Sequence, residues 1–166
     1  MPDNPDNPAP ELRPAGAGEA ERLAALHRQA FGARAWDAQS FARLLKQEGV
    51  EALTAFVRGE LCGMVLYRQA ADEGEILTIA VMPAMRRRGI GGRLLASAMT
   101  TMMMQGASRL FLEVAADNAA ALALYEQAGF ERLGMRPGYY AGADGPGRDA
   151  VLMVRYLHAG CGDCDT

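Results

Sequence analysis

The sequence predicts one domain of the α/β (α+β) class, in which helices and strands alternate around a mixed β-sheet. Its 166 residues are enough for one domain with a hydrophobic core. Half of the residues are hydrophobic and 22% are charged, which is the balance of a globular protein. Apolar residues recur at helical spacing in some segments and alternate with polar residues in others, which predicts both kinds of element.

Two helices are expected early in the chain, over residues 18–31 and 36–47. His27 falls outside the apolar face of the first helix, so we expect its side chain to be exposed. Trp36 is expected to anchor the turn into the second helix. The predicted inward faces comprise Ala20, Leu23, Leu26, Ala30 and Phe31 in the first helix and Phe41, Leu44 and Leu45 in the second.

Three strands are expected to follow as an antiparallel meander. Residues 54–69 predict two strands joined by a turn at Gly59–Glu60, because glycine is typical of tight turns. Residues 75–81 predict the third strand. Pro83 ends it, because proline has no backbone N–H to donate.

The second half of the chain predicts two more helices and three more strands. A helix is expected from about Gly89 to Gln105 and a strand over 109–114. The next helix, over 117–129, would be capped by Asp117 or Asn118 and ended by Gly129 in the C′ position. Strands near 130–135 and 149–157 close the domain. The buried face of the helix from Gly89 would comprise Gly91, Leu94, Leu95, Ala98 and Met102, and the run 102–104 is predicted to pack rather than to bind a soft metal.

Both ends of the chain are expected to lie outside the folded domain. Residues 1–11 predict a flexible arm, 12–157 the domain and 158–166 a flexible tail. Cys161 and Cys164 have the spacing of a metal or redox pair, but zinc needs four ligands and only His158 is nearby, so a disordered tail is favoured. No secretory signal or membrane-spanning run is visible, and three cysteines build no disulfide framework, so a cytoplasmic location is expected.

Residues 86–95, RRRGIGGRLL, gather positive charge and small side chains between a predicted strand and a predicted helix. The first N–H groups of a helix have no intrahelical partner and the helix dipole is positive there, which suits an anion. Gly89 and Gly91 would let a phosphate approach these groups, and Arg87 and Arg88 would add charge at the rim. A loop without a ligand and a solvated basic run remain open alternatives. A nucleic-acid patch is the weakest, because the net charge of the chain is −3.

Two segments together resemble a known family. The pattern Arg86-x-x-Gly89-x-Gly91 after an apolar strand resembles the acyl-CoA pyrophosphate motif of the Gcn5-related N-acetyltransferases (GNAT). Residues 112–130, LEVAADNAAALALYEQAGF, resemble their second cofactor segment. With RPGYY at 136–140, the pattern is similar to the ribosomal-protein-alanine N-acetyltransferases, over about residues 12–157.

The resemblance implies the GNAT fold, a mixed central sheet with a splayed strand pair and flanking helices. It implies acetyl-CoA as cosubstrate with no metal, and the N-terminal α-amine of a small-subunit ribosomal protein as acceptor. From the charge and the lack of a long apolar run, no nucleic-acid or membrane partner is expected. By position, it implies that the cofactor would be bound by Ile79, Ala80, Val81, Arg87, Arg88, Gly89, Ile90, Gly91, Gly92 and Asn118.

The same resemblance implies catalytic roles. Glu113 would be the general base and Tyr125 the general acid, acting chiefly as a hydrogen-bond donor to the departing thiolate. Tyr139 and Tyr140 would border the peptide channel. The family often has acidic residues before the final strand, where this chain has Arg148, so the choice of acceptor stays open.

Simpler structural roles remain open for these residues. Glu113 would then be a strand-end carboxylate paired with an arginine, and Asn118 only a helix cap. Tyr125 would be a core aromatic in a helical stripe with Ala121, Leu124 and Ala128. The sequence therefore predicts an acetyl-CoA-dependent protein N-terminal acetyltransferase. The alternatives are transfer to a small-molecule amine or a lysine, and a non-catalytic acyl-CoA sensor.

Overall fold

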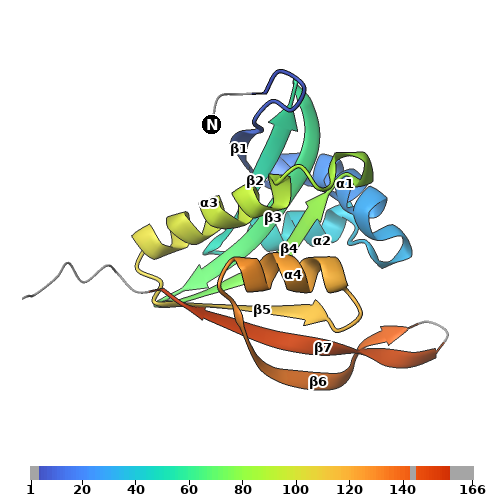
Figure 1. Ribbon diagram of the computed structural model, residues 1–166, viewed down its shortest axis with the longest axis vertical. Coiled ribbons are helices and arrows are strands. Elements are labelled where there is room, and N and C mark those ends of the chain that lie inside the picture. The colour runs from blue at the N-terminus through green and yellow to red at the C-terminus, as the bar shows by residue number, and fades with distance from the viewer. Residues whose placement is uncertain (1–3, 143–144, 158–166) are drawn as a thin grey trace, which may run out of the picture. The chain divides into compact units, whose positions relative to one another are not determined.

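The computed structural model describes residues 4–142 and 145–157 (Figure 1). In these residues the helical elements are η1 (Ala17–Glu19), α1 (Ala20–Phe31), η2 (Gly32–Arg34), α2 (Ala38–Leu45), η3 (Pro83–Met85), α3 (Ile90–Met104) and α4 (Ala119–Gln127). The strands are β1 (Glu11–Ala15), β2 (Val50–Val57), β3 (Glu60–Ala70), β4 (Glu73–Val81), β5 (Arg109–Ala115), β6 (Glu131–Gly142) and β7 (Gly145–Tyr156).

The strands form one sheet in the order β1-β2-β3-β4-β5-β7-β6. The pairs β1–β2, β2–β3, β5–β7 and β6–β7 are antiparallel, whereas β4–β5 is parallel. The β4–β5 register runs from Glu73↔Arg109 to Ile76↔Leu112, although β4 continues to Val81 and β5 to Ala115. This mixed sheet, whose parallel pairing stops part-way along both strands, confirms the predicted fold class.

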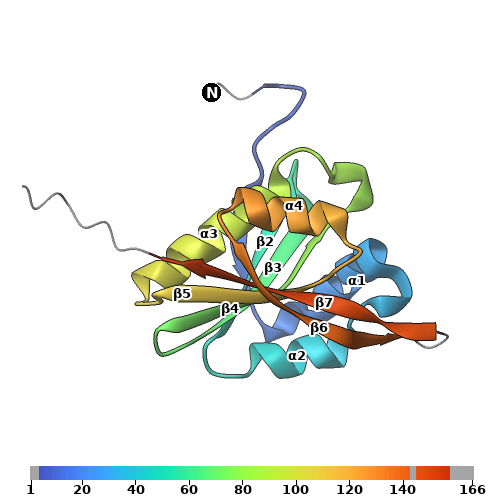
Figure 2. The ribbon, with the colours of Figure 1, turned by 60° about the horizontal axis from the view of Figure 1, so that its bottom comes forward.

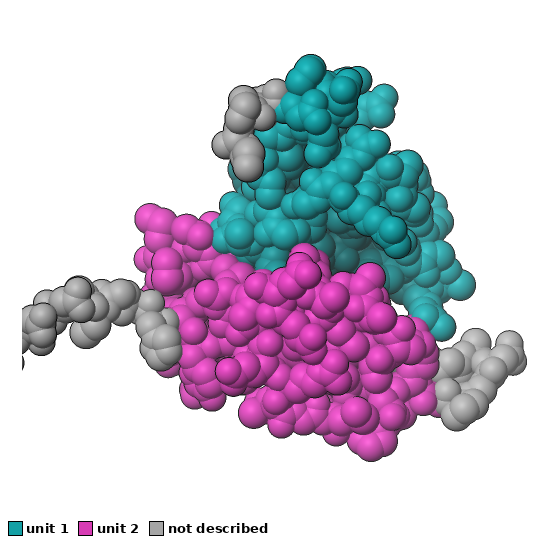
Figure 3. Space-filling model, in the orientation of Figure 1, with its two compact units in different colours: residues 1–68, 77–98 teal, residues 69–76, 99–166 magenta. Residues whose placement is uncertain are grey.

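The chain folds as two compact units (Figure 3). Unit 1 comprises residues 1–68 and 77–98, and unit 2 comprises residues 69–76 and 99–166. Strands β3 and β4 and helix α3 therefore contribute residues to both. The boundaries expected from the sequence, at residues 11 and 157, stay predictions.

In unit 1, helices α1 and α2 cover one face of the β1–β3 strands and the first turns of α3 cover the other (Figure 1). Met64 and Leu66 of β3 pack into the cluster formed with α1 and α2. Gly63 points the opposite way, because successive residues of a strand face opposite sides of the sheet. A Cβ atom at Gly63 would come within 3.0 Å of both Ile90 and Leu94, so glycine lets α3 pack closely against β3.

The expectation that His27 is exposed is wrong. Its side chain is 2% exposed, and its ring lies against the rings of Phe31, Trp36 and Phe41. One ring nitrogen, Nδ1, accepts a hydrogen bond from the Trp36 backbone N–H, and Nε2 lies 3.0 Å from the Thr78 hydroxyl. Because both nitrogens have partners, an aromatic cage can enclose the imidazole. Trp36 lies at the turn into α2, as expected.

In unit 2, α4 lies on one face of strands β5 and β7 (Figures 1 and 2). Arg155 of β7 points to this face, since it donates to the Ala128 carbonyl at the end of α4. Gly129 follows with φ +87, the left-handed conformation of the predicted C′ glycine. Leu110, Leu112 and Met153 are buried in this unit.

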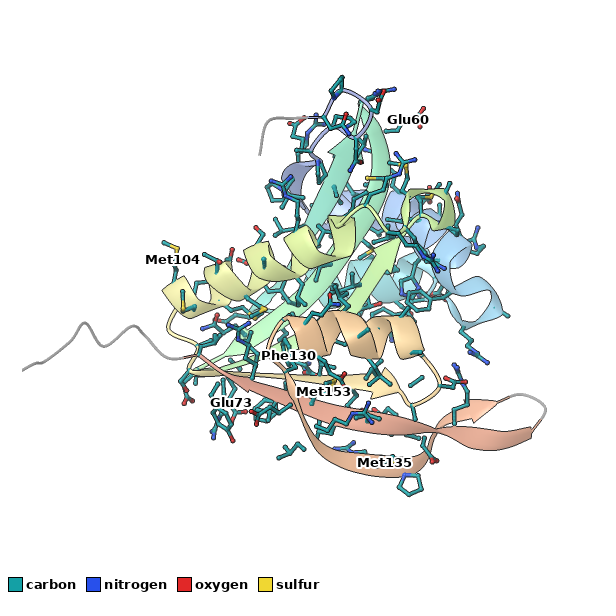
Figure 4. The ribbon with its side chains drawn as sticks, viewed as in Figure 1. Glu60, Glu73, Met104, Phe130, Met135 and Met153 are labelled. Carbon is teal, nitrogen blue, oxygen red and sulfur yellow. The ribbon has the colours of Figure 1, made fainter. Side chains whose placement is uncertain are left out.

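Three local predictions need correction. The β2–β3 turn consists of Arg58 and Gly59, with Glu60 already in β3, and both turn residues have positive φ. Of the three consecutive methionines only Met102 is buried, whereas Met104 is 81% exposed and points away from α3 (Figure 4). In α4 the buried side chains are those of Leu122 and Tyr125, whereas Ala121, Leu124 and Ala128 of the predicted stripe are half-buried.

Candidate active site

The loop before α3, residues 86–89, is the first part of the candidate site and lies in unit 1. The Gly89 carbonyl accepts a hydrogen bond from the Arg93 N–H at 3.0 Å, so the helix begins at this point. Gly89 has φ +78 and is exposed, and a Cβ atom there would meet nothing within 4 Å. The N–H groups of the first helical turn have no intrahelical acceptor. This open helix start can therefore receive an anion.

The three arginines of the loop do different things. Arg86 donates to the Ala30 carbonyl at the end of α1, at 3.2 Å, where a cation also complements the helix dipole. Arg87 and Arg88 are exposed beside Gly89. Arg87 has φ +64, a backbone conformation that residues other than glycine rarely adopt. Arg86 therefore anchors the loop to α1, and Arg87 and Arg88 supply its exposed charge.

The end of β4 lies beyond its pairing with β5, which stops at Ile76. Ala80 is 2% exposed and its side chain packs in the unit 1 core, whereas Ile79 and Val81 are half-buried. A ligand at this strand would therefore meet its peptide groups. The resemblance gives these three residues that same role.

In unit 2, Glu113 of β5 has two polar partners on β6. Its Oε1 lies 3.1 Å from Nη1 of Arg136, and its carboxylate also accepts a hydrogen bond from the Tyr139 hydroxyl. The charge of Glu113, with this hydrogen bond, raises the pKa of Tyr139. The side chain of Glu113 is 19% exposed, against 56% for Arg136. Glu113 thus makes the arginine pairing that its structural role predicted and remains partly open to solvent.

Helix α4 carries the other two candidates of unit 2. Tyr125 is 7% exposed, and its ring lies edge-on to Phe130 with the ring centres 5.9 Å apart. Asn118 caps the helix, since its Oδ1 accepts a hydrogen bond from the Ala121 N–H at 3.1 Å. Both residues therefore have structural roles, and a catalytic or binding role would come in addition to these.

Glu113 and α4 lie on opposite faces of the unit 2 strands. Glu113 pairs in register with Leu152, which is an odd number of residues from Arg155 on β7. Because side chains alternate along a strand, Leu152 and Glu113 point away from the face that Arg155 and α4 share. The two catalytic candidates therefore do not exchange a proton directly.

A family model supplies the decisive comparison: the acetyltransferase (GNAT) family matches residues 20–130. The chain belongs to the GNAT family. The N-alpha-acetyltransferase RimI of Mycobacterium tuberculosis is 39% identical over 142 residues, which is 82% of this chain and 86% of that protein. The ribosomal protein bS18-alanine N-acetyltransferase of Escherichia coli K12 is 38% identical over 96 residues, 58% of this chain and 64% of that enzyme.

The crystal structure of the Escherichia coli ribosomal-protein-S18-alanine N-acetyltransferase superposes with a TM-score of 0.82 at 29% identity, covering 91% of this GNAT chain and 96% of that one. The chain spans only 38% of the length of a Mycobacterium leprae relative to which it is 40% identical. In the described part of the GNAT chain, no helix is both long and apolar enough to cross a membrane. Within the same residues, His, Cys, Asp and Glu side chains form no group of three that would hold a metal ion.

Sequence reasoning missed two residues of this candidate site, Arg136 and Asp149. Asp149 accepts a hydrogen bond from the Gly138 N–H at 2.9 Å, within the stretch where the β6–β7 register shifts between Arg136 and Tyr140. The signal in the sequence was the Pro-Gly pair at 137–138, which is typical of an irregular strand. Tyr140 lies opposite Arg148 on β7, and the predicted tail with Cys161 and Cys164 lies outside the described residues.

Proposed function

We propose that this chain transfers the acetyl group of acetyl-CoA to the N-terminal α-amine of a protein, and that its acceptor is the N-terminal alanine of a small-subunit ribosomal protein. The proposal that the chain binds acetyl-CoA rests on the open start of α3, where Gly89 leaves room at the helix N-terminus beside Arg87 and Arg88. The names of the Mycobacterium tuberculosis and Escherichia coli relatives support the acceptor.

The helix start would bind the pyrophosphate of acetyl-CoA through the N–H groups of residues 89–92, with Arg87 and Arg88 supplying charge. Ile79, Ala80 and Val81 would pair with the pantetheine arm through their backbone. Two observations support this role: the β4–β5 register ends at Ile76, and the Ala80 side chain is committed to the core. Asn118 would contact the same arm with the part of its amide that does not cap α4.

The acceptor amine must attack as the free base. An α-amine of pKa about 8 needs roughly 1.4 kcal/mol to be neutral at pH 7, whereas a lysine of pKa about 10.4 needs about 4.6 kcal/mol. A carboxylate suffices as base for the first. Glu113 would take the proton from the attacking nitrogen, directly or through one water, and its partly open side chain supports such access.

As the new C–N bond forms, the C–S bond of the thioester breaks and leaves a thiolate. Full proton transfer from a phenol of pKa about 10 to a thiolate of pKa about 8.5 is uphill by roughly 2 kcal/mol. Tyr125 would therefore act as a hydrogen-bond donor to the developing charge. Tyr139 and Tyr140 would border the acceptor peptide, and the 51% exposure of Tyr139 supports that place.

The test measures acetyl transfer to a peptide that begins with alanine, against an internal-lysine peptide and a polyamine. We expect the alanine peptide to be preferred, and mass spectrometry to find the acetyl group on its α-amine. Glu113→Gln and Tyr125→Phe should keep acetyl-CoA affinity and lose rate by on the order of 10² to 10⁴.

Matched controls are Glu126→Gln and Tyr156→Phe, which change exposed residues of unit 2 and should leave the rate unchanged. Preference for lysine or polyamine would refute the acceptor. Binding of acetyl-CoA without any turnover would point to a sensor, and full activity in both catalytic variants would refute the assigned roles.

A further inference from the structure

Arg136 and Tyr139 both reach Glu113 because β6 is irregular between them. Residues three apart on a regular strand point to opposite faces of the sheet. Here the β6–β7 register shifts between Arg136 and Tyr140, and Gly138 has φ +64. A bulge of this kind turns the strand so that its side chains point in new directions. Both side chains contact the Glu113 carboxylate, so both lie on the Glu113 face.

The bulge is held in place from β7. The Asp149 carboxylate accepts a hydrogen bond from the Gly138 N–H, at the residue that carries the positive φ. The carbonyl of Asp149 also accepts a bond from the Ala116 N–H, which extends the β5–β7 pairing past the end of β5. Asp149 thus connects the strand of Glu113 to the bulge that carries its partners.

The three side chains form one contact group, which we call the Glu113 cluster: Glu113, Arg136 and Tyr139. Arg136 lies 3.1 Å from the Glu113 carboxylate, and its guanidinium also lies over the Tyr139 ring, 5.5 Å from its centre. Such stacking orients a guanidinium that would otherwise move freely in solvent. Two donors therefore fix the carboxylate from the β6 side.

We propose that Arg136 is a positioning residue that, with the Asp149-held bulge, keeps the Glu113 carboxylate aimed for proton abstraction. This inference rests on the proposed acetyl transfer and deepens it. Glu75 on β4 also acts on Tyr139, and it pairs with Phe111 and so shares the face of Glu113, where Arg109 of β5 lies over the Phe111 ring. On β7 the neighbour in register is the apolar Leu152.

The first test compares kcat and KM for the alanine peptide and for acetyl-CoA in Arg136→Met, Arg136→Lys and the wild-type chain. In Arg136→Met, we expect kcat to fall roughly 10- to 100-fold with little change in KM for acetyl-CoA, because the base is misaligned. Arg136→Lys keeps a cation at this position but not the planar guanidinium, so it should restore only part of kcat.

Arg132→Met is the matched control, since Arg132 lies on the same strand and pairs with the exposed Glu126. It should keep the wild-type kcat and KM. Asp149→Asn should lower kcat in the same direction as Arg136→Met. An Arg136→Met variant with the wild-type kcat would overturn the proposal, and so would one with raised kcat.

A second readout needs no activity. The ionisation of Tyr139 can be followed by ultraviolet absorbance, as the difference between each protein and the same protein carrying Tyr139→Phe. Since the Glu113 charge raises the pKa of Tyr139 and the Arg136 charge lowers it, Glu113→Gln should move this ionisation to lower pH and Arg136→Met to higher pH.

If neither variant changes the pH at which Tyr139 ionises, the Glu113 cluster itself is refuted. If the wild-type chain acetylates no peptide while both movements occur, the proposed function fails and the cluster stands.

Discussion

At the scale of single residues, His27 shows how a polar side chain can be part of a hydrophobic core. Its burial lowers the pKa of the imidazole to about 4. The neutral ring accepts the Trp36 N–H through Nδ1, which requires the proton to sit on Nε2, beside the Thr78 hydroxyl. Protonation would turn Nδ1 into a donor facing another donor, so the fold stabilises the neutral imidazole of His27.

This burial predicts a pH-dependent stability. The pKa of His27 is lower in the folded chain than the ordinary value of 6.5, so the unfolded chain binds more protons between these values. The contribution of neutral His27 to the free energy of unfolding is complete above about pH 6.5. It is on the order of 3 kcal/mol and is lost as the pH falls through about 4. Urea unfolding at pH 7.5 and 4.5 measures this difference in the free energy of unfolding.

The control is His27→Gln, whose amide does not titrate. Its stability should fall less than that of the wild-type chain over the same range, although it should be lower at pH 7.5 because buried partners lose a well-placed bond. An equal fall in both proteins would show that carboxylates alone cause the pH dependence.

At the scale of elements, the start of α3 depends on a backbone conformation that glycine adopts without strain. Gly89→Ala places a side chain at φ +78, which costs about 1–2 kcal/mol, and puts a methyl group in the open space beside the helix start. We expect acetyl-CoA affinity to fall at least 10-fold by calorimetry. Gly18→Ala, also open but without positive φ, should leave affinity unchanged. Equal affinity in both variants would remove Gly89 from the cofactor site.

The positive-φ residues also separate what local patterns predict from what they do not. Gly129 follows α4 as a C′ glycine, where the helical spacing and the Gly itself predicted it. Arg58 and Gly59 both have positive φ, which is the geometry of a two-residue hairpin turn that matches strand twist. Arginine is not typical of the first turn position, so the prediction from the sequence placed this turn at Gly59–Glu60, one residue too late.

At the scale of the whole molecule, ligand binding should be visible as stability. A ligand that binds only the folded chain stabilises it by about 2.7 kcal/mol at 100 times its Kd. We therefore expect acetyl-CoA to raise the Tm in a concentration-dependent way, and less so at high salt because Arg87 and Arg88 are exposed. Glu113→Gln should show the full rise and Gly89→Ala a smaller one. A Tm that does not respond to acetyl-CoA would contradict the proposed function.

The amino-acid pattern alone was enough for the order of α1–α4 and of β2–β7, the loop at 86–89, a cap at Asp117 or Asn118 and the family, but it missed β1. These features depend on neighbours within a few residues, such as helical spacing, strand alternation and glycine at a helix start. The burial of His27 and the partners of Glu113 depended on tertiary structure. Arg136 comes to Glu113 only through the pairing of β5 with β7 and of β7 with a bulged β6, and no local pattern encodes which side chains such a register brings together.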